Sequence, residues 1–150
     1  MSRAFVKEME TAEPPPERLV SEGPNLVTEA GYAQIAAQVE ELEAALKDNP
    51  GELQRETLER DLRYWQVQKA SAEIVPPSQE DAVAFGSRVT IARNGREQTF
   101  RIVGEDEADP ARGLVNFRAP LADAVLGARQ GETVEAAAPL GEITILKIEN

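Results

Sequence analysis

The 150-residue sequence contains no cysteine and no histidine, and both absences narrow the chemistry open to it. Without cysteine there is no disulfide, no thiolate nucleophile and no cysteine-based zinc site. Without histidine, a catalytic triad with a histidine base and a histidine-ligated metal are both impossible. An enzyme built from the remaining residues would depend on carboxylates, lysine, tyrosine or hydroxyl groups, and its metal would be an oxygen-ligated Mg²⁺ or Ca²⁺.

Long apolar runs and an excess of basic side chains are missing as well. No run is long enough for a signal peptide or a membrane span, so we expect a cytoplasmic protein. The chain has 27 acidic and 16 basic residues and a net charge of −11, which opposes binding to nucleic acid or anionic lipid across the whole surface. A hydrophobic fraction of 41% suffices for one ordinary domain, or for a small domain with an appendage.

The first half of the chain predicts a helical hairpin after a disordered leader. Residues 1–25 combine consecutive prolines with scattered charge, which is typical of disorder. A hairpin is expected over residues 26–75. Thr28 is a suitable N-cap, and a helix over 29–47 is indicated by an apolar stripe at Tyr32, Ile35, Val39, Leu42 and Leu46. The sequence DNPG at 48–51 forces a turn, and a second helix is expected over 53–74, before Pro76 and Pro77.

The second half changes from a helical to a strand periodicity. Residues 76–86 are expected to be a linker, and residues 87–150 a small antiparallel sheet crossed by one short helix. The pair Asn94-Gly95 between SRVTIAR and REQTFRIVG predicts a β-hairpin with a type I′ turn. A third strand is expected in GLVNFR, the helix in PLADAVLG, and a final strand pair after it. The predicted fold class is therefore α+β.

The stretch RIVGEDEADPARGLVNFRAPLADAVLGARQGETVE resembles the C-terminal domain of the Gre (GreA/GreB) transcript-cleavage factors. The positions that match in register are Gly104, Asp106, Glu107, Ala108, Asp109, Pro120, Leu121, Ala124, Leu126, Gly127, Gly131 and Val134. The opening of the first helix, LVTEAGYAQIAAQVEEL, is similar to the start of the Gre coiled coil, so the resemblance spans residues 26–149. It implies an antiparallel coiled coil followed by an FKBP-like domain.

The resemblance also implies a partner, bacterial RNA polymerase. The globular domain would bind the rim of the secondary channel, and the hairpin would enter it, with indirect contact to the 3′ end of the nascent RNA. The residues implied in docking are Asp106, Asp109, Ala119, Pro120 and Leu121. Those implied at the hairpin tip are Asp48, Asn49 and Glu52.

A structural interpretation of the same residues stays open. Asp109 and Pro110 could only shape a turn, while Leu121 and Leu126 fill the core. Asp48 could open the hairpin turn, and Glu52 could favour the N-terminus of the second helix through the helix dipole.

The hairpin tip departs from the cleavage factors. Their signature, close to G-D-L-S-E-N-A-E-Y, does not occur between Leu46 and Leu58. The hairpin is also shorter by roughly 25 residues, or on the order of 18 Å of reach. The chain is closer to short-hairpin GreB-like and Rnk-type members. We therefore expect a secondary-channel regulator of elongation that does not cleave transcripts and is not an enzyme, at most stimulating the polymerase's own cleavage. No metal and no cofactor are expected, and the free protein is expected to be a monomer.

Four other interpretations remain. The chain could be a cleavage factor that acts through Asp48 and Glu52. The acids at 105, 106, 107 and 109 could hold a hard cation, although they lack the ligand spacing of a calcium loop. An FKBP-like fold could be a prolyl isomerase, but such an enzyme needs an aromatic-lined pocket, and Phe85, Phe100 and Phe117 alternate as core residues do. Lastly, the narrow apolar face of the hairpin could mediate self-association.

Overall fold

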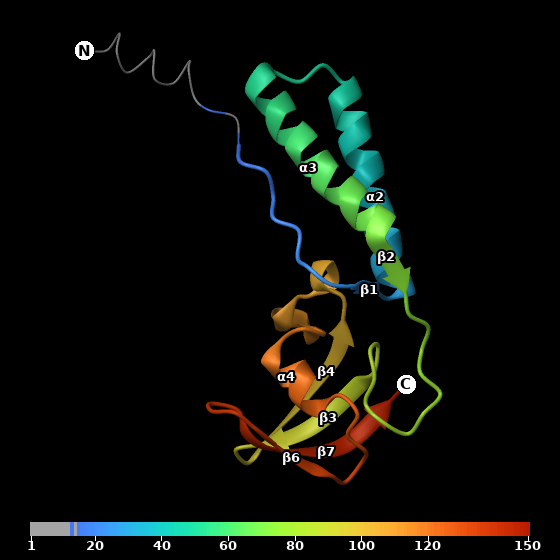
Figure 1. The fold of residues 1–150 in the computed structure, drawn as a ribbon, viewed down its shortest axis with the longest axis vertical. Coiled ribbons are helices and arrows are strands. Elements are labelled where there is room, and N and C mark those ends of the chain that lie inside the picture. The colour runs from blue at the N-terminus through green and yellow to red at the C-terminus, as the bar shows by residue number, and fades with distance from the viewer. Residues whose placement is uncertain (1–12, 14) are drawn as a thin grey trace, which may run out of the picture. The chain divides into compact units, whose positions relative to one another are not determined.

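A computed structural model describes residue 13 and residues 15–150 (Figure 1). The chain divides into two compact units. The hairpin unit comprises the residues up to Glu22 together with Ala36–Ala70, and the sheet unit comprises Gly23–Ile35 and Ser71–Asn150. The first helix begins in the sheet unit and continues into the hairpin unit. Most of the predicted leader, residues 1–12 and 14, lies outside the described residues.

Two helices form the antiparallel hairpin, α2 (Glu29–Lys47) and α3 (Glu52–Ser71) (Figure 1). The first has the predicted bounds, and Thr28 caps it, because the Gly31 amide donates to the Thr28 hydroxyl at 3.0 Å. Ile35 and Val39 of the apolar stripe are buried. The second helix ends earlier than predicted. Ile74 and Val75 beyond its end are β-branched, and Val75 precedes Pro76; both properties favour an extended backbone.

These extended residues form a short parallel ladder within the sheet unit. Strand β2 (Ala72–Ile74) pairs with β1 (Asn25–Val27), so that Leu26 lies opposite Glu73. Val27 in β1 is buried, and its carbonyl accepts a hydrogen bond from the Val75 amide at 2.9 Å. The sequence analysis assigned Asn25 to the leader and residues 72–74 to a helix. In the structure both segments are strands, because each supplies the ladder partner that the other needs.

The sheet unit contains a five-stranded sheet in the order β5-β4-β3-β7-β6. The strands are β3 (Arg88–Arg93), β4 (Arg96–Val103), β5 (Leu114–Asn116), β6 (Thr133–Ala136) and β7 (Gly141–Glu149). Asn94 and Gly95 both have positive φ, 54° and 73°, as the predicted type I′ turn requires. The α+β fold class is confirmed. The sheet is mixed rather than wholly antiparallel, because β5 runs parallel to β4 after the chain returns through residues 104–113.

One hydrophobic core lies between this sheet and the short helix α4 (Pro120–Val125). Its buried residues are Val83, Phe85, Val89, Ile91, Phe100, Ile102, Ala122, Val125, Ala128, Ile143 and Ile145. Two of them, Val83 and Phe85, come from residues 76–86, which were expected to be a linker. Val83 exchanges backbone hydrogen bonds of 2.8 Å with Gly127 and Ala128, so this part of the segment is fixed to the domain.

Candidate functional site

The acid-rich stretch after β4 forms two 3₁₀ turns, η1 (Glu105–Glu107) and η2 (Pro110–Arg112). Gly113 ends the second turn with a φ of 74°, a conformation that favours glycine. The 104–113 segment thereby returns the chain to the edge of β4, where Leu114 pairs with Arg101. Two backbone bonds between Asp109 and Leu114, of 2.8 and 3.1 Å, close the loop. The backbone of Asp109 therefore does shape a turn.

Glu107 has a structural role that the sequence analysis did not find. Its carboxylate accepts hydrogen bonds from the backbone amides of Thr28 and Gly104, each at 3.0 Å, and from the Thr28 hydroxyl. Two glycines make room for this arrangement. A Cβ on Gly31 would lie 2.1 Å from the Glu107 carboxyl carbon, and one on Gly104 would lie 2.4 Å from the Leu26 carbonyl oxygen. A Glu three residues after Gly104, the place that Glu takes in a capping box, was the available signal.

The residues implied in docking lie on two segments that both pack against β5. Asp106 is in η1, and both it and Asp109 are half-buried. Ala119 is the N-cap of α4, and its carbonyl accepts a hydrogen bond from the Asp123 amide at 2.9 Å. The remaining two, Pro120 and Leu121, follow it in the first turn. The structure thus brings the acids and the apolar segment to one region of the sheet unit.

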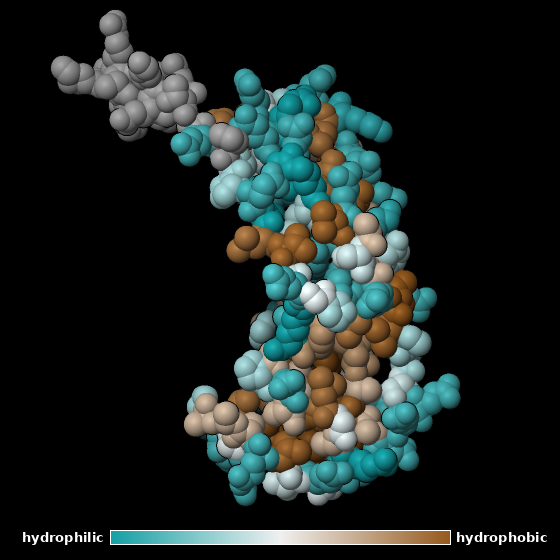
Figure 2. Space-filling view, in the orientation of Figure 1, coloured by the Kyte–Doolittle hydropathy of each residue, from teal (hydrophilic) through white to brown (hydrophobic). Residues whose placement is uncertain are grey.

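The apolar docking candidates differ in exposure. Pro120 is exposed, whereas Leu121 is half-buried and packs against the core. Leu126 does not fill the core as expected: 38% of its surface is exposed, and Val125 beside it is buried instead. Figure 2 shows apolar surface scattered among hydrophilic side chains on the visible face. Among the residues that the structure describes, the large apolar side chains found exposed are Leu19, Val20, Leu53, Val67, Ile74 and Leu126.

At the hairpin tip, Asp48, Asn49 and Glu52 are all exposed. Asn49 has a φ of 48°, so it supplies the left-handed residue of the turn. The Asp48 amide donates to the Ala45 carbonyl at 3.3 Å, and Glu52 lies in the first turn of α3, where its charge complements the helix dipole. Asp48 therefore lies at the start of the turn and Glu52 at the N-terminus of α3, as the structural interpretation requires. Both carboxylates are also exposed to solvent.

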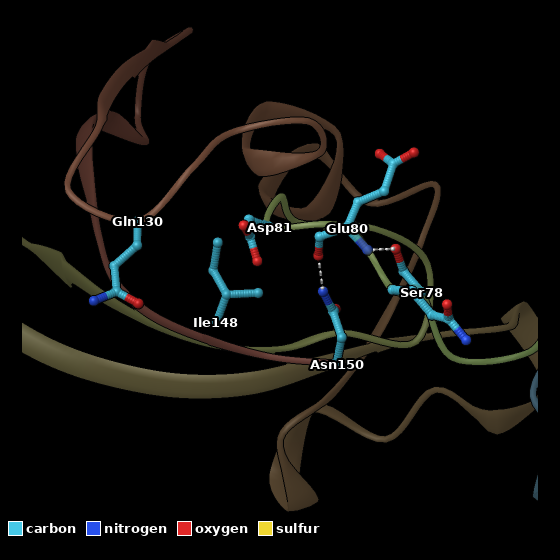
Figure 3. A pocket seen from close by; sticks show the side chains of 7 residues that line it. Ser78, Glu80, Asp81, Gln130, Ile148 and Asn150 are labelled. Atoms are coloured by element: carbon cyan, nitrogen blue, oxygen red, sulfur yellow. Dashed lines mark hydrogen bonds between the residues drawn. The ribbon is translucent and has the colours of Figure 1, made fainter.

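A surface pocket of about 370 Å³ lies elsewhere in the sheet unit (Figure 3). Its lining comes from residues 78–81, from Gln130 and from the end of β7 at Ile148 and Asn150. The Asn150 amide nitrogen donates to the Glu80 carbonyl at 2.7 Å, and the Ser78 hydroxyl accepts from the Glu80 amide at 3.1 Å. None of the docking candidates lines this pocket, and its bonds fix the segment before β3.

Two alternative sites can be compared with the structure. Among residue 13 and residues 15–150, no group of three or more metal-ligating side chains lies together. Phe100 and Phe85 belong to the core, and Phe85 packs edge-to-face on Phe117, with ring centroids 5.5 Å apart. These rings fill the core, as their spacing predicted.

Across the same described residues, no helix combines the length and the apolar character needed to span a membrane.

Comparison with known proteins identifies the sheet unit. Residues 78–150 match the family described as "Transcription elongation factor, GreA/GreB, C-term". The chain is 41% identical over 73 residues to transcription elongation factor GreA of Paracoccus denitrificans, covering 47% of each protein. It is 40% identical over 75 residues to GreA of Verminephrobacter eiseniae, covering 47% of this chain and 48% of the relative. The chain thus spans about half the length of these curated relatives.

Solved structures of Gre-related proteins are also similar. Gfh1, a GreA factor homolog from Thermus thermophilus, is 18% identical, with a TM-score of 0.42 over 85% of this chain and 100% of that one. A GreA/GreB factor from Nitrosomonas europaea is 20% identical, with a TM-score of 0.41 over 86% of this chain and 100% of that one.

Together the fold and the family match define an α+β domain similar to the C-terminal domain of the GreA/GreB elongation factors. Residues 78–150 match the C-terminal domain of the GreA/GreB family, and the resemblance found in the sequence is confirmed over this part of the chain. The expectation that the protein is not an enzyme needs correction. The curated relatives are named transcription elongation factor GreA, a factor that stimulates transcript cleavage by RNA polymerase, and this similarity contradicts the expectation.

Proposed function

We propose that this protein binds bacterial RNA polymerase and regulates transcription elongation by inserting its helical hairpin into the secondary channel. The observation that carries the proposal is the GreA/GreB match over residues 78–150, in a chain that also contains the α2–α3 hairpin. The occupied channel would be closed to longer Gre factors and to other channel ligands. The free protein would be a monomer, which light scattering can measure.

In this proposal the sheet unit provides the docking surface. Asp106 and Asp109 form its acidic part, and Ala119, Pro120 and Leu121 form its apolar part. The packing of both segments against β5 and the exposure of Pro120 support this assignment. An acidic rim around a small apolar contact suits a helical coiled coil with basic flanks on the partner, because the charges are complementary.

The hairpin tip would lie inside the channel, near the 3′ end of the RNA. Asp48, Asn49 and Glu52 support this role because the side chains of all three are exposed. A second candidate function, stimulation of transcript cleavage, is favoured by the two tip carboxylates and by the name of the relatives. Metal ligands require placement within tenths of an ångström, so this candidate needs a channel position that compensates for the short hairpin.

Docking can be tested with core polymerase in a competition binding assay. We expect the variants Asp109→Asn and Pro120→Ala each to weaken binding about tenfold. The first loses one charge-assisted hydrogen bond to the partner, and the second loses one apolar contact. Asp81→Asn is the matched control, because Asp81 is an exposed acid in the pocket of Figure 3. Equal binding by all of these variants would overturn the docking assignment, and no binding by the parent protein would overturn the function.

The role of the tip is tested with a backtracked elongation complex and Mg²⁺, with the RNA resolved on a gel. Suppression of cleavage by a longer Gre factor, without shortened RNA from this protein alone, supports regulation by occupancy. Shortened RNA that is lost in Asp48→Asn/Glu52→Gln supports the second candidate. Retained polymerase binding by that double variant would separate the tip from the docking surface.

A further inference from the structure

The face of the sheet opposite α4 carries basic side chains. Val89, Ile91 and Phe100 point into the core beneath α4, so the alternating residues of β3 and β4 point to the other face. Arg88 lies opposite Arg101 in the ladder, and Thr90 lies opposite Thr99, with their hydroxyl oxygens 3.0 Å apart. Two arginines thus lie side by side on neighbouring strands, next to a pair of hydroxyls.

A pocket of about 320 Å³ lies at this position, near the edge strand β5. Arg112 from the turn η2 joins the two arginines of the sheet, and no acidic residue lines the pocket, whose walls are Arg88, Thr99, Phe100, Arg101, Arg112, Gly113 and Leu114. Gly113 keeps this wall close to β4, because a Cβ there would lie 3.3 Å from the Thr99 carbonyl oxygen. The volume is at the lower end of the range for small-molecule sites.

The positive charge of this arginine pocket is largely uncompensated. Among the described residues, Arg88 is the one arginine of the pocket that forms an ion pair, with Glu149, at a nitrogen-oxygen distance of 3.7 Å. The same carboxylate is 3.0 Å from the Lys147 ammonium group, so it is shared between two cations. Within the described part of the chain, Arg101 and Arg112 form no ion pair.

Glu149, at the border of the pocket, lies in a positively charged environment. Its hydrogen bond with Lys147 is the main cause that lowers the pKa of this carboxyl below its ordinary value, and the charges of Arg88 and Arg101 lower it further. Guanidinium groups remain protonated at all physiological pH values and match phosphate oxygens with paired donors. The local chemistry is therefore suited to an anion.

The net charge of −11 limits the size of that anion. A long polyanion such as RNA would extend over the acidic remainder of the surface and be repelled. A small anion responds mainly to charges within about 8 Å, the screening length at physiological salt. We propose that the arginine pocket binds a diphosphate group, carried by inorganic pyrophosphate or by a nucleoside diphosphate, with Arg101 and Arg112 as the main ligands and Arg88 as the third.

The test is a titration of the isotope-labelled full chain with pyrophosphate and, in a second arm, with ADP, followed by amide NMR signals. We expect saturable shifts at Thr99, Arg101, Gly113 and Leu114. Tighter binding of ADP would identify a nucleotide as the source of the diphosphate, and equal binding would identify the diphosphate alone.

Two variants make the test specific. Arg101→Gln/Arg112→Gln should weaken binding about tenfold or more, because two charge-assisted contacts are lost. Arg96→Gln, at the far end of the same β-hairpin, should change it by less than about twofold. Unperturbed amide spectra of both variants would establish that they are folded. The proposal is overturned if pyrophosphate gives no saturable shifts, if the double variant binds as tightly as the parent, or if only an RNA oligomer binds.

Discussion

Thr28 and Glu107, 79 positions apart in the sequence, are joined by two hydrogen bonds. The Glu107 carboxylate accepts from the backbone amide of Thr28 and from its hydroxyl, and it also accepts from the amide of Gly104. The residue that caps α2 is thereby attached to the loop between β4 and β5. One of the four acids considered as a hard-cation site thus stabilises the fold.

Gly31 is expected to resist substitution because of this carboxylate. In Gly31→Ala the new methyl group would displace Glu107 from its hydrogen bonds, at a cost of about 1–3 kcal/mol. The gain in helix propensity offsets about 1 kcal/mol of that loss. We therefore expect net destabilisation, measured by urea unfolding with circular dichroism.

Gly51→Ala is the control, because a Cβ there meets no atom within 4 Å, and its effect should be within about 0.5 kcal/mol. In a Glu107→Ala background, Gly31→Ala should no longer destabilise. An equal loss in both backgrounds would show that Glu107 is not the group displaced.

Thr28→Ala should destabilise the start of α2 by about 1–2 kcal/mol, because it removes the cap of the Gly31 amide and one of the bonds to Glu107. Thr28→Ser keeps the hydroxyl and should stay within about 0.5 kcal/mol of the parent. The measurement is the free energy of unfolding, together with hydrogen exchange at the Gly31 amide. Equal losses in the two variants would assign the effect to the methyl group instead of the cap.

The segment before β1 is held on α3 by Arg18. Its guanidinium carbon lies 3.8 Å from the centroid of the Tyr64 ring and 5.4 Å from that of Trp65, and it pairs with Asp61 at 3.7 Å. Since Trp65 is the only tryptophan, its fluorescence reports this contact. In Arg18→Ala the segment should leave the ring more often. The fraction of molecules with an uncovered Trp65, and with it the quenching of Trp65 by acrylamide, should rise by about two- to fivefold.

The control for that variant is Arg93→Ala in the sheet unit, which should leave the quenching unchanged. Arg18→Lys should give an intermediate value, because an ammonium group keeps the charge and loses the planar stacking. Quenching that is the same in Arg18→Ala and in the parent protein would contradict the contact.

The same segment should also respond to acid. Hydrogen bonds from Arg63 lower the pKa of Glu17 below its ordinary value of 4.5. A lowered pKa means that the pair contributes stability above pH 4.5 and loses it as the pH falls through the lower, folded-state value. Both side chains are exposed, so the effect is small and decreases with salt.

The expected result is a rise in Trp65 quenching as the pH falls below 4.5, with a smaller rise in Glu17→Gln. Comparing the parent protein with Glu17→Gln separates the effect of the Glu17–Arg63 pair from that of the other carboxylates, which protonate in the same pH range. Identical pH profiles for the two proteins would show that Glu17 does not hold the segment.

Local patterns in the sequence determined the parts of this protein that depend on neighbouring residues. The 3.6-residue periodicity and the Thr28 cap fixed the bounds of α2, and the Asn94-Gly95 pair fixed the turn between β3 and β4. These features depend on bonds within a few residues, so the chain encodes them locally. The order of matched positions around Asp106, Asp109 and Pro120 identified the family and named the docking candidates; their role stays a prediction.

The tertiary structure decided the features that depend on contacts between residues far apart in the sequence. The pairing of β1 with β2 joins residues 47 positions apart at Asn25 and Ala72, and no pattern in either segment names the other. The parallel direction of β5, the burial of Val83 and the carboxylate bonds of Glu107 have the same cause. An extended segment or an acid has many candidate partners in a sequence. Only the packing of the whole domain, which must satisfy its buried polar groups, selects one of them.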